Sequence, residues 1–478
     1  MKKTFLFFIF LLFIIFISPT FCYECGKAPP TRDVQRRKAA ESFPPLPLPA
    51  TPVRRTEKKN PPAPPVLVGK VLVAPNAKWT RAEMDVENLL KLASSQLGIP
   101  HRSVKITLSE FSFDPDEVPV LYITSVEPFV VDASILPKLK SYLERGGFIW
   151  ANASSGSNDF TKGFLELMSQ IYPEKNLYPI YSNHPLNGCF HNLTNVKIMK
   201  DGVEFSGKTE LMVLNLGCRA AVILSPFDLG CGWAMHTHPW GSRYVPEDAI
   251  KIGVNMFSYT LGWIETGRLY GQIPVFAEKT EKKGGRIYIG QIIHSGDWDP
   301  HPSSLGKLLV RVARDTESSV YIEKLNIDLK KETLENIPLL YITGHFDPKL
   351  SKVEKQKLRK FLLSGGALIS DSCCGSKEFS DSFKLLISEI LPEAKNSKWD
   401  INHSLYNVPF KTEKFIYTFN TDEAPFEIYH LKGLPSIIFS PYSFGSGWEG
   451  IPRPYVKALS DTQSIKLGVN VITYLITH

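Results

Sequence analysis

Short apolar runs alternate with amphipathic segments along most of this chain. One such run, residues 119–124 (PVLYIT), is rich in residues that suit a buried strand, and it precedes a stretch whose apolar side chains recur at helical spacing. Gly146-Gly147 supply the positive φ of a helix C-cap, and a second apolar run, residues 148–150, follows at once. This order predicts two parallel strands joined by a right-handed helical crossover.

The same pattern returns 219 residues later. Residues 118–174 align with residues 337–393 without a gap, and about a third of the positions are identical. A second block of matching positions lies later in each copy, at an offset of 215. The duplication predicts two homologous α/β domains, residues 66–264 and 286–478, each of a normal size for one hydrophobic core.

After its second apolar run, each copy turns sharply into another amphipathic helix, through residues 152–156 or residues 371–375. Open parallel sheets bind ligands outside the carboxyl ends of their strands, so we expect any chemistry near these turns. In the second copy, the helix before the turn is predicted to bury one apolar face formed by Leu350, Val353, Leu358, Phe361 and Leu362.

The N-terminus has the pattern of an export signal. Lys2-Lys3 precede an uninterrupted apolar run from Phe5 to Ile17, which is too short to span a bilayer comfortably. We predict that residues 1–22 are a signal peptide, and we keep open the alternative that they remain as an N-terminal anchor. Either interpretation places the protein outside the cytoplasm, in the periplasm or secreted.

Residues 23–65 are predicted to be a disordered, basic linker. Residues 26–65 contain 11 prolines, nine Lys or Arg and three Asp or Glu, a composition that cannot bury a core. The linker supplies +6 and the segment before it +1 of the net charge of +7, which leaves the two domains near zero. Without a basic excess in either domain, nucleic-acid binding is not expected. Residues 265–285 are predicted to connect the domains.

Several segments in both copies carry recognisable motifs. They are Tyr341-Ile342-Thr343-Gly344-His345, Gly365-Gly366 with Asp371-Ser372-Cys373-Cys374-Gly375, Gly296-Asp297-Trp298-Asp299-Pro300, and the run from Ser225 to Trp233. These motifs resemble domain-of-unknown-function family 4159, whose fold is similar to that of class I glutamine amidotransferases. The resemblance covers nearly all of residues 66–478. It implies two tandem three-layer flavodoxin-like, amidotransferase-like domains with mainly parallel central sheets, and it implies no established activity.

Neither copy carries the complete family pattern. The first has Ser125-Val126 where the family shows Gly-His, and Asn152-Ala153-Ser154-Ser155 where it shows Asp-Asp-Cys-Cys. The second has Ser443 and Ser446 in place of the Asp and Cys of the tryptophan loop. Each domain lacks what the other keeps, so a self-sufficient active site in either one is not expected.

The Cys373-Cys374-Gly375 turn lies where the resemblance implies a nucleophile elbow. A thiol beside a helix N-terminus has a lowered pKa, and the Cys-x-Gly spacing favours Cys373 as the nucleophile. His403 could act as its base, with Asp371 or His345 orienting the imidazole. Against this hypothesis, neither copy shows the His-x-Glu arrangement of amidotransferases, and small residues also occur at such turns for steric reasons.

Four tryptophans recur at matching loop positions, namely Trp79, Trp233, Trp298 and Trp448. Indole rings near carboxylates can stack on sugar rings. The alternative is that these residues anchor loops in the core, as large apolar side chains more often do.

Loops expected on one rim of the second sheet also carry candidate metal ligands, which are His294, Asp297, Asp299, His301, His345 and Asp347. They lack any tightly spaced ligand motif, and aspartates are common in solvated turns. We therefore predict no metal and no cofactor.

Taken together, these features favour non-enzymatic recognition of a glycan or protein partner in the cell envelope. The expected ligand-binding residues are Asp297, Trp298, His345, Trp448, Trp79 and Trp233. The alternative is a cysteine-dependent hydrolase or amidase that uses Cys373, His403 and Asp371. We expect the two domains to pack as an intramolecular pseudo-dimer, and only the N-terminal segment to meet a membrane.

Overall fold

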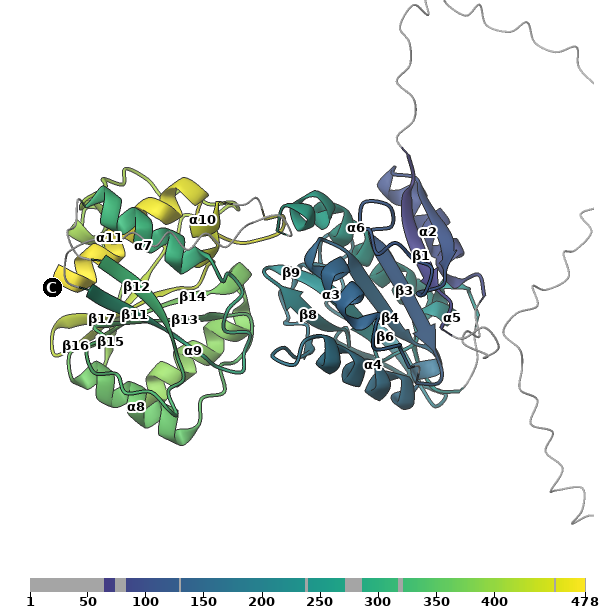
Figure 1. The fold of residues 1–478 in the computed structure, drawn as a ribbon, viewed down its shortest axis with the longest axis horizontal. Helices are drawn as coiled ribbons and strands as arrows, with labels where there is room; N and C mark the ends of the chain where they lie inside the picture. Colours follow the sequence, from purple (N-terminus) through teal and green to yellow (C-terminus); the bar gives the residue numbers. More distant parts are fainter. Residues whose placement is uncertain are drawn as a thin grey trace, which may run out of the picture. The chain divides into compact units, whose positions relative to one another are not determined.

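Each repeat folds around its own seven-stranded sheet (Figure 1). The computed structural model describes residues 64–73, 83–128, 130–236, 240–270, 286–316, 321–450 and 453–477. The signal segment, nearly all of the linker, Trp79 and residues 271–285 lie outside the described residues, so the predictions made for them stay predictions.

The first sheet has the strand order β2-β1-β3-β4-β9-β8-β5. Its strands are β1 (Val66–Val71), β2 (His101–Ile106), β3 (Val120–Ser125), β4 (Phe148–Ala153), β5 (Tyr178–Pro179), β8 (Met212–Leu216) and β9 (Arg219–Ser225). The first five strands in this order run parallel, whereas β8 and β5 each run antiparallel to the neighbour before them. A small antiparallel sheet is added by β6 (Val196–Lys200), β7 (Val203–Gly207) and β10 (Ser242–Tyr244).

The second sheet repeats this topology in the order β12-β11-β13-β14-β17-β16-β15. Its strands are β11 (Arg286–Ile292), β12 (Tyr321–Ile327), β13 (Leu339–Gly344), β14 (Ala367–Ser372), β15 (Lys395–Ser397), β16 (Glu427–Leu431) and β17 (Leu434–Ser440). If the five parallel strands of each sheet are numbered one to five along the chain, their order in the sheet is 2-1-3-4-5, which is that of doubly wound flavodoxin-like folds. The prediction of two tandem α/β domains with mainly parallel sheets is confirmed.

Helices cover both faces of each sheet, as Figure 1 shows for the second repeat. In the first repeat, α2 (Asp85–Leu97), α5 (Gly230–Trp233) and α6 (Pro246–Tyr270) pack on one face, and α3 (Leu136–Glu144) and α4 (Asn158–Ile171) on the other. In the second repeat, α7 (Ser304–Asp315), α10 (Gly445–Glu449) and α11 (Asp461–Thr477) lie opposite α8 (Lys352–Leu363) and α9 (Lys377–Ile390). The central strands are therefore buried on both faces, which explains their continuous apolar sequence.

Two sequence-based boundaries differ from the structure. Helix α8 begins at Lys352, because Ser351 caps it in a reciprocal capping box with Glu354. Val353 consequently points outward with 59% of its surface exposed, and Leu350 precedes the helix, although both were expected on its buried face. Helix α6 continues to Tyr270, so the first six residues of the expected connector are helical.

The surface that the first repeat contributes to the contact between the repeats is not equivalent to the surface that the second contributes. The ring of Tyr178 in the first repeat stacks on Phe346 in the second, with 4.3 Å between their centroids. Asn183 donates to Gly375 O at 2.9 Å and accepts from Lys377 N at 3.0 Å. The β5 segment of the first repeat thus packs against the loops that follow β13 and β14 in the second.

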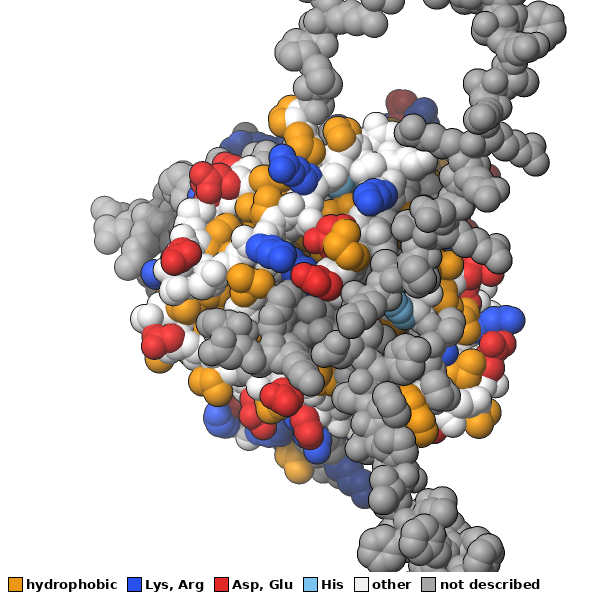
Figure 2. All heavy atoms as spheres, turned by 90° about the vertical axis from the view of Figure 1, so that its right-hand side faces the viewer, with side chains coloured by type: hydrophobic (Ala, Val, Ile, Leu, Met, Phe, Trp, Pro, Cys, Tyr) orange, Lys and Arg blue, Asp and Glu red, His pale blue; other side chains and the backbone are white. Residues whose placement is uncertain are grey.

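Charged side chains on the face shown in Figure 2 are of both signs and are interspersed with apolar ones. Within the described part of the chain, no helix is both long enough and apolar enough to cross a bilayer.

Trp233→Ala should destabilise the first repeat strongly. The indole is fully buried and donates to Ala249 O at 2.8 Å, so its removal leaves a cavity that we expect to cost about 3–5 kcal/mol. Trp240, which is 73% exposed, provides the control, since Trp240→Ala should cost less than about 0.5 kcal/mol. Urea unfolding followed by circular dichroism measures both, and similar midpoints for the two variants would contradict the assignment of Trp233 to the core.

Candidate functional site

The carboxyl edge of the second sheet brings thiols and imidazoles together. Gly344 pairs with Ser372, so β13 and β14 end at the same level of the sheet. His345 therefore follows its strand directly beside the turn that holds Cys373 and Cys374. The distance from His345 Nε2 to Cys374 Sγ is 3.2 Å.

The turn after β14 is tightly constrained. It forms one 3-10 turn, η3 (Cys373–Gly375), in which Cys374 and Gly375 have φ of 58° and 70°. The left-handed conformation costs a non-glycine residue roughly 1–2 kcal/mol, and a Cβ on Gly375 would lie 2.8 Å from Lys457 Cβ. Ser376 then caps α9 and donates to His345 O at 2.6 Å, which fixes the thiol turn to the imidazole loop.

A third thiol comes from the first repeat. Cys218 lies in the two-residue turn between β8 and β9, and its Sγ is 3.6 Å from Cys373 Sγ. The Sγ atoms of Cys373 and Cys374 are 3.7 Å apart. A disulfide needs about 2.05 Å, so all three thiols are free. They are closed off from solvent, with exposed fractions of 6% for Cys218, 0% for Cys373 and 8% for Cys374.

His301 links this cluster to a buried carboxylate. Its Nε2 lies 3.3 Å from both Cys218 Sγ and Cys373 Sγ, and its Nδ1 lies 3.3 Å from Glu449 Oε2. Burial lowers the pKa of His301, but the charge of Cys218 and the hydrogen bond with Glu449 raise it to about 9. Burial likewise raises the pKa of Glu449, and the hydrogen bond and charge of His301 lower it to about 2. A charged imidazole therefore sits between the thiols and a charged carboxylate.

The three thiols do not ionise alike. Burial raises the pKa of Cys218, but hydrogen bonds with Cys373 and Cys374 and the charge of His301 outweigh it and hold this pKa well below its usual range. Burial and the neighbouring thiols raise the pKa of Cys373. Burial and Cys218 raise the pKa of Cys374 to about 12, although Cys373 and His345 act to lower it. Of the three thiols, Cys218 is therefore the one whose pKa is lowered.

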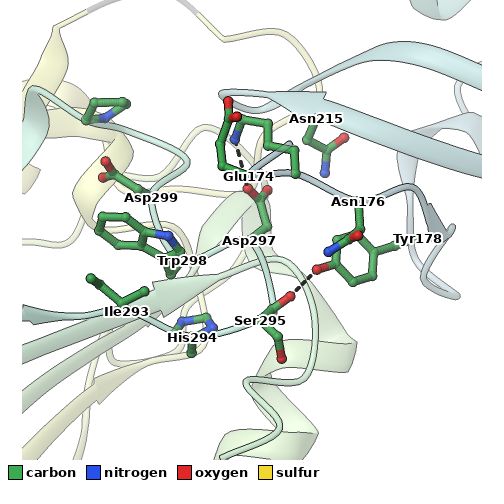
Figure 3. Close-up of a pocket in the computed structure, with 12 residues that line it drawn as sticks. Glu174, Asn176, Tyr178, Asn215, Ile293, His294, Ser295, Asp297, Trp298 and Asp299 are labelled. Atoms are coloured by element: carbon green, nitrogen blue, oxygen red, sulfur yellow. Dashed lines mark hydrogen bonds and ion pairs between the residues drawn. The ribbon is translucent and has the colours of Figure 1, made fainter. Parts of the chain in front are cut away.

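A cavity of about 420 Å³ opens beside the cluster (Figure 3). Figure 3 shows Trp298 and Asp299 on one side and Asn176 and Tyr178 of the first repeat on the other, with Asp297 between them. Its remaining lining residues are Glu174, Lys175, Asn215, Ile293, His294, Ser295 and Pro302. Asp297 joins the cavity to the cluster, because its Oδ2 lies 2.7 Å from His345 Nδ1 while its Oδ1 lies 3.5 Å from Lys175 Nζ.

The profile of a domain of unknown function, DUF4159, matches residues 68–261 and 288–476. The chain belongs to the DUF4159 family. It contains two tandem DUF4159 domains, as the resemblance indicated, whereas the likeness to class I amidotransferases stays a prediction. A search of curated proteins finds no match.

The second DUF4159 domain holds four of the expected site residues together, namely Asp297, Trp298, His345 and Cys373. His403 has a different place. Its ring stacks on Trp399 at 3.8 Å, near Tyr474 of α11, and its Nδ1 accepts from Leu405 N. The expectation that His403 serves Cys373 is corrected, because His403 caps a turn on the α11 side and His301 occupies the position beside the thiol.

Asp371, which was expected to orient the catalytic imidazole, makes structural hydrogen bonds in the second domain. It accepts from Tyr341 Oη at 2.6 Å and from the backbone N–H groups of Phe444 and Gly445 at 2.7 and 3.0 Å. The carboxylate therefore ties the β17–α10 loop to β14.

Trp233 and Trp448 lie in the cores of the two DUF4159 domains. Their exposed fractions are 0% and 3%, and each indole donates to a helix carbonyl, that of Ala249 or Ser464. The expectation that they contact a ligand is corrected in favour of the alternative, in which they anchor their loops.

The candidate metal ligands of the loops do not converge as a set. His294 bonds to Thr343 O and Gly296 N, Asp299 to Gln291 and Lys324, and Asp347 to Lys349 N.

Sequence reasoning missed Cys218 and Glu449, which neighbour the site only through tertiary contacts. The signal available was the complementary loss, since Ser154-Ser155 stand in the first repeat where Cys373-Cys374 stand in the second.

Glu449→Gln should make the free energy of unfolding less dependent on pH in the acidic range. The folded pKa of about 2 lies below the ordinary value of 4.5, so the carboxylate stabilises the fold above pH 4.5 and this stabilisation is lost as the pH falls toward 2. Near neutral pH the variant should lose about 1–3 kcal/mol, because His301 and Arg453 lose a charged partner. Urea midpoints measured at several pH values test this, with the exposed Glu413→Gln as the control. A deficit that stays constant as the pH falls from 4.5 would contradict it.

Proposed function

We propose that this protein recognises a polar, hydroxyl-rich ligand, a glycan segment, in the cavity beside Trp298 without transforming it chemically. The observation that carries the proposal is the lining of this cavity, which combines one indole ring with carboxylates, amides and a lysine from both domains. Its volume of about 420 Å³ falls within the roughly 300–1,000 Å³ of typical ligand sites.

The lining offers the contacts that sugars use. The half-buried Trp298 ring presents an apolar face on which the C–H groups of a pyranose can stack. Asp297 and Asp299 are held in place by Lys175 and Lys324, and so can accept hydroxyl hydrogens at fixed positions. Asn215 Oδ1 is buried without a hydrogen-bond partner among the described residues, which leaves an acceptor available to a ligand.

The predicted export signal suggests where such a ligand would be met. An exported protein with a basic tether encounters cell-wall and other envelope glycans, so these are the first ligands to test. If no such glycan binds, a protein partner that contacts the same loops is the remaining candidate.

Trp298→Ala should weaken glycan binding by at least about tenfold, because the stacking surface is lost. Titration of the full chain with soluble cell-wall fragments should quench or shift tryptophan fluorescence, and this change should vanish in the variant. Trp240→Ala, which removes an exposed indole outside the cavity, is the matched control and should titrate like the parent. If no fragment of a broad panel alters the fluorescence, or if Trp298→Ala responds like the parent, glycan recognition in this cavity is refuted.

A second candidate, a cysteine hydrolase or amidase, is favoured by one observation. Cys373, His301 and Glu449 form a thiol–imidazole–carboxylate chain with two distances of 3.3 Å, the order in which nucleophile, base and orienting group act. Here His301 and Glu449 would take the roles expected of His403 and Asp371. Against this candidate, Cys373 Sγ is covered by Cys218 and has no exposed surface for a substrate carbonyl.

Alkylation separates the two candidates. Under the recognition proposal, iodoacetamide at neutral pH should label Cys373 no faster than Cys189, since Cys373 is fully buried and Cys189 only partly. Labelling is read by peptide mass spectrometry on the native chain. A rate at Cys373 more than about tenfold above that at Cys189, and lost in His301→Ala, would instead establish the activated thiol that a hydrolase requires.

A further inference from the structure

Four potential metal-ligand atoms converge where the two domains meet. The Sγ atoms of Cys218, Cys373 and Cys374 and a ring nitrogen of His345 all lie within 4.8 Å of one another. We propose that these four residues bind a zinc ion, and that this ion joins the two DUF4159 domains.

The separations of the ligand atoms fit tetrahedral zinc. With Zn–S bonds of about 2.3 Å, the sulfur atoms of a tetrahedral site lie about 3.8 Å apart. The observed Sγ distances are 3.6 Å between Cys218 and Cys373 and 3.7 Å between Cys373 and Cys374. His345 Nε2 completes the set at 3.2 Å from Cys374 Sγ. Three thiolates and one imidazole are a ligand set that zinc favours over the harder magnesium and calcium ions.

The surroundings of His345 prepare it to ligate. Its Nδ1 lies 2.7 Å from Asp297 Oδ2, an arrangement in which Nδ1–H donates to the carboxylate and leaves Nε2 free to bind metal. Carboxylate–histidine pairs of this kind recur around protein-bound zinc, where they orient the ring and make the ligand nitrogen more basic. Lys175 holds Asp297 from the other side at 3.5 Å.

The charges around the cluster also fit. Three thiolates and Zn²⁺ carry a net charge of −1, which needs compensation in a buried site. His301 is placed for this purpose, because its Nε2 lies 3.3 Å from the Sγ atoms of both Cys218 and Cys373 and can donate to either sulfur. Glu449 holds the other ring nitrogen of His301.

The site is closed, which points to a structural role for the ion. The exposed fractions of its four ligands are between 0% and 8%, and protein atoms would fill all four tetrahedral positions around a bound ion. A catalytic zinc would instead keep a position open for water or substrate.

Within the described ranges, the equivalent positions of the two repeats do not provide a second site of this kind. In the first repeat, Val126, Ser154 and Ser155 stand where the second has His345, Cys373 and Cys374. In the second repeat, Gly433 stands at the hairpin position of Cys218. The ligands are therefore divided between the domains, three from one and one from the other, so that binding the ion also fixes the contact between them.

Metal analysis of the full chain, purified under reducing conditions without a metal-affinity step, tests the proposal. We expect about one zinc per chain. Cys218→Ser and Cys374→Ser should each reduce this to less than about a tenth, because a three-ligand site holds zinc far more weakly. Cys189→Ser and Cys231→Ser are matched controls, since neither residue belongs to the cluster, and they should keep the full complement.

Cobalt provides a second measurement that does not depend on the folding of any variant. Chain stripped with a chelator and then loaded with Co²⁺ should show the sulfur-to-cobalt charge-transfer band and the intense visible bands of tetrahedral thiolate coordination. One equivalent of Zn²⁺ should abolish them. Trp298→Ala should bind metal like the parent, so that failure of the glycan proposal and failure of this one can be told apart.

Three results would overturn the proposal. The first is a parent chain that contains no zinc and gives no tetrahedral cobalt spectrum. The second is full zinc content in Cys218→Ser, which would show that the first domain supplies no ligand and that the ion does not join the domains. The third is a disulfide between Cys218 and Cys373 in the native chain, found by mass spectrometry without reduction.

Discussion

The level at which parallel strands end is the constraint on which the site depends. Because β13 and β14 are paired up to their last residues, the chain must leave both strands at the same edge of the sheet. His345 and the Cys373–Gly375 turn follow directly, and Ser376 ties one to the other. A shift in this register would separate the imidazole from the thiols, so the hydrogen bonding of the strands sets the geometry of the cluster.

The two repeats show how a duplicated fold can divide its tasks. At the edge of the first sheet, the same positions hold a hydrogen-bonded polar network, in which Asn152 donates to Asp228 and Asp228 accepts from Ser155 N. That network fixes the turn without reactive groups. The first domain contributes instead through its β8–β9 turn and β5, which cover the edge of the second domain and bring Cys218 to it.

Asp297 connects the two sites of interest. One of its oxygen atoms lies beside His345 in the cluster, and the other faces Lys175 at the cavity. Desolvation opposes its ionisation, but the hydrogen bond from His345 and the charge of Lys175 lower its pKa. A ligand in the cavity and the state of the cluster would therefore both act on one charged carboxylate, which gives the two proposed sites a short physical connection.

The sequence by itself determined the secondary structure of the core, the duplication and the edge of the sheet at which polar loops gather. Apolar periodicity and glycine caps depend on neighbouring residues, so they can be recognised without coordinates, and they placed Cys373, His345 and Trp298 at one edge. Only the tertiary structure decided which side chains meet there. His301 lies beside Cys373 and His403 does not, although both histidines belong to loops of the same domain. Cys218 arrives from the other repeat, 155 residues away in the chain. Such pairings depend on how loops fold back and how domains contact each other, and no local pattern of apolar and polar residues records either.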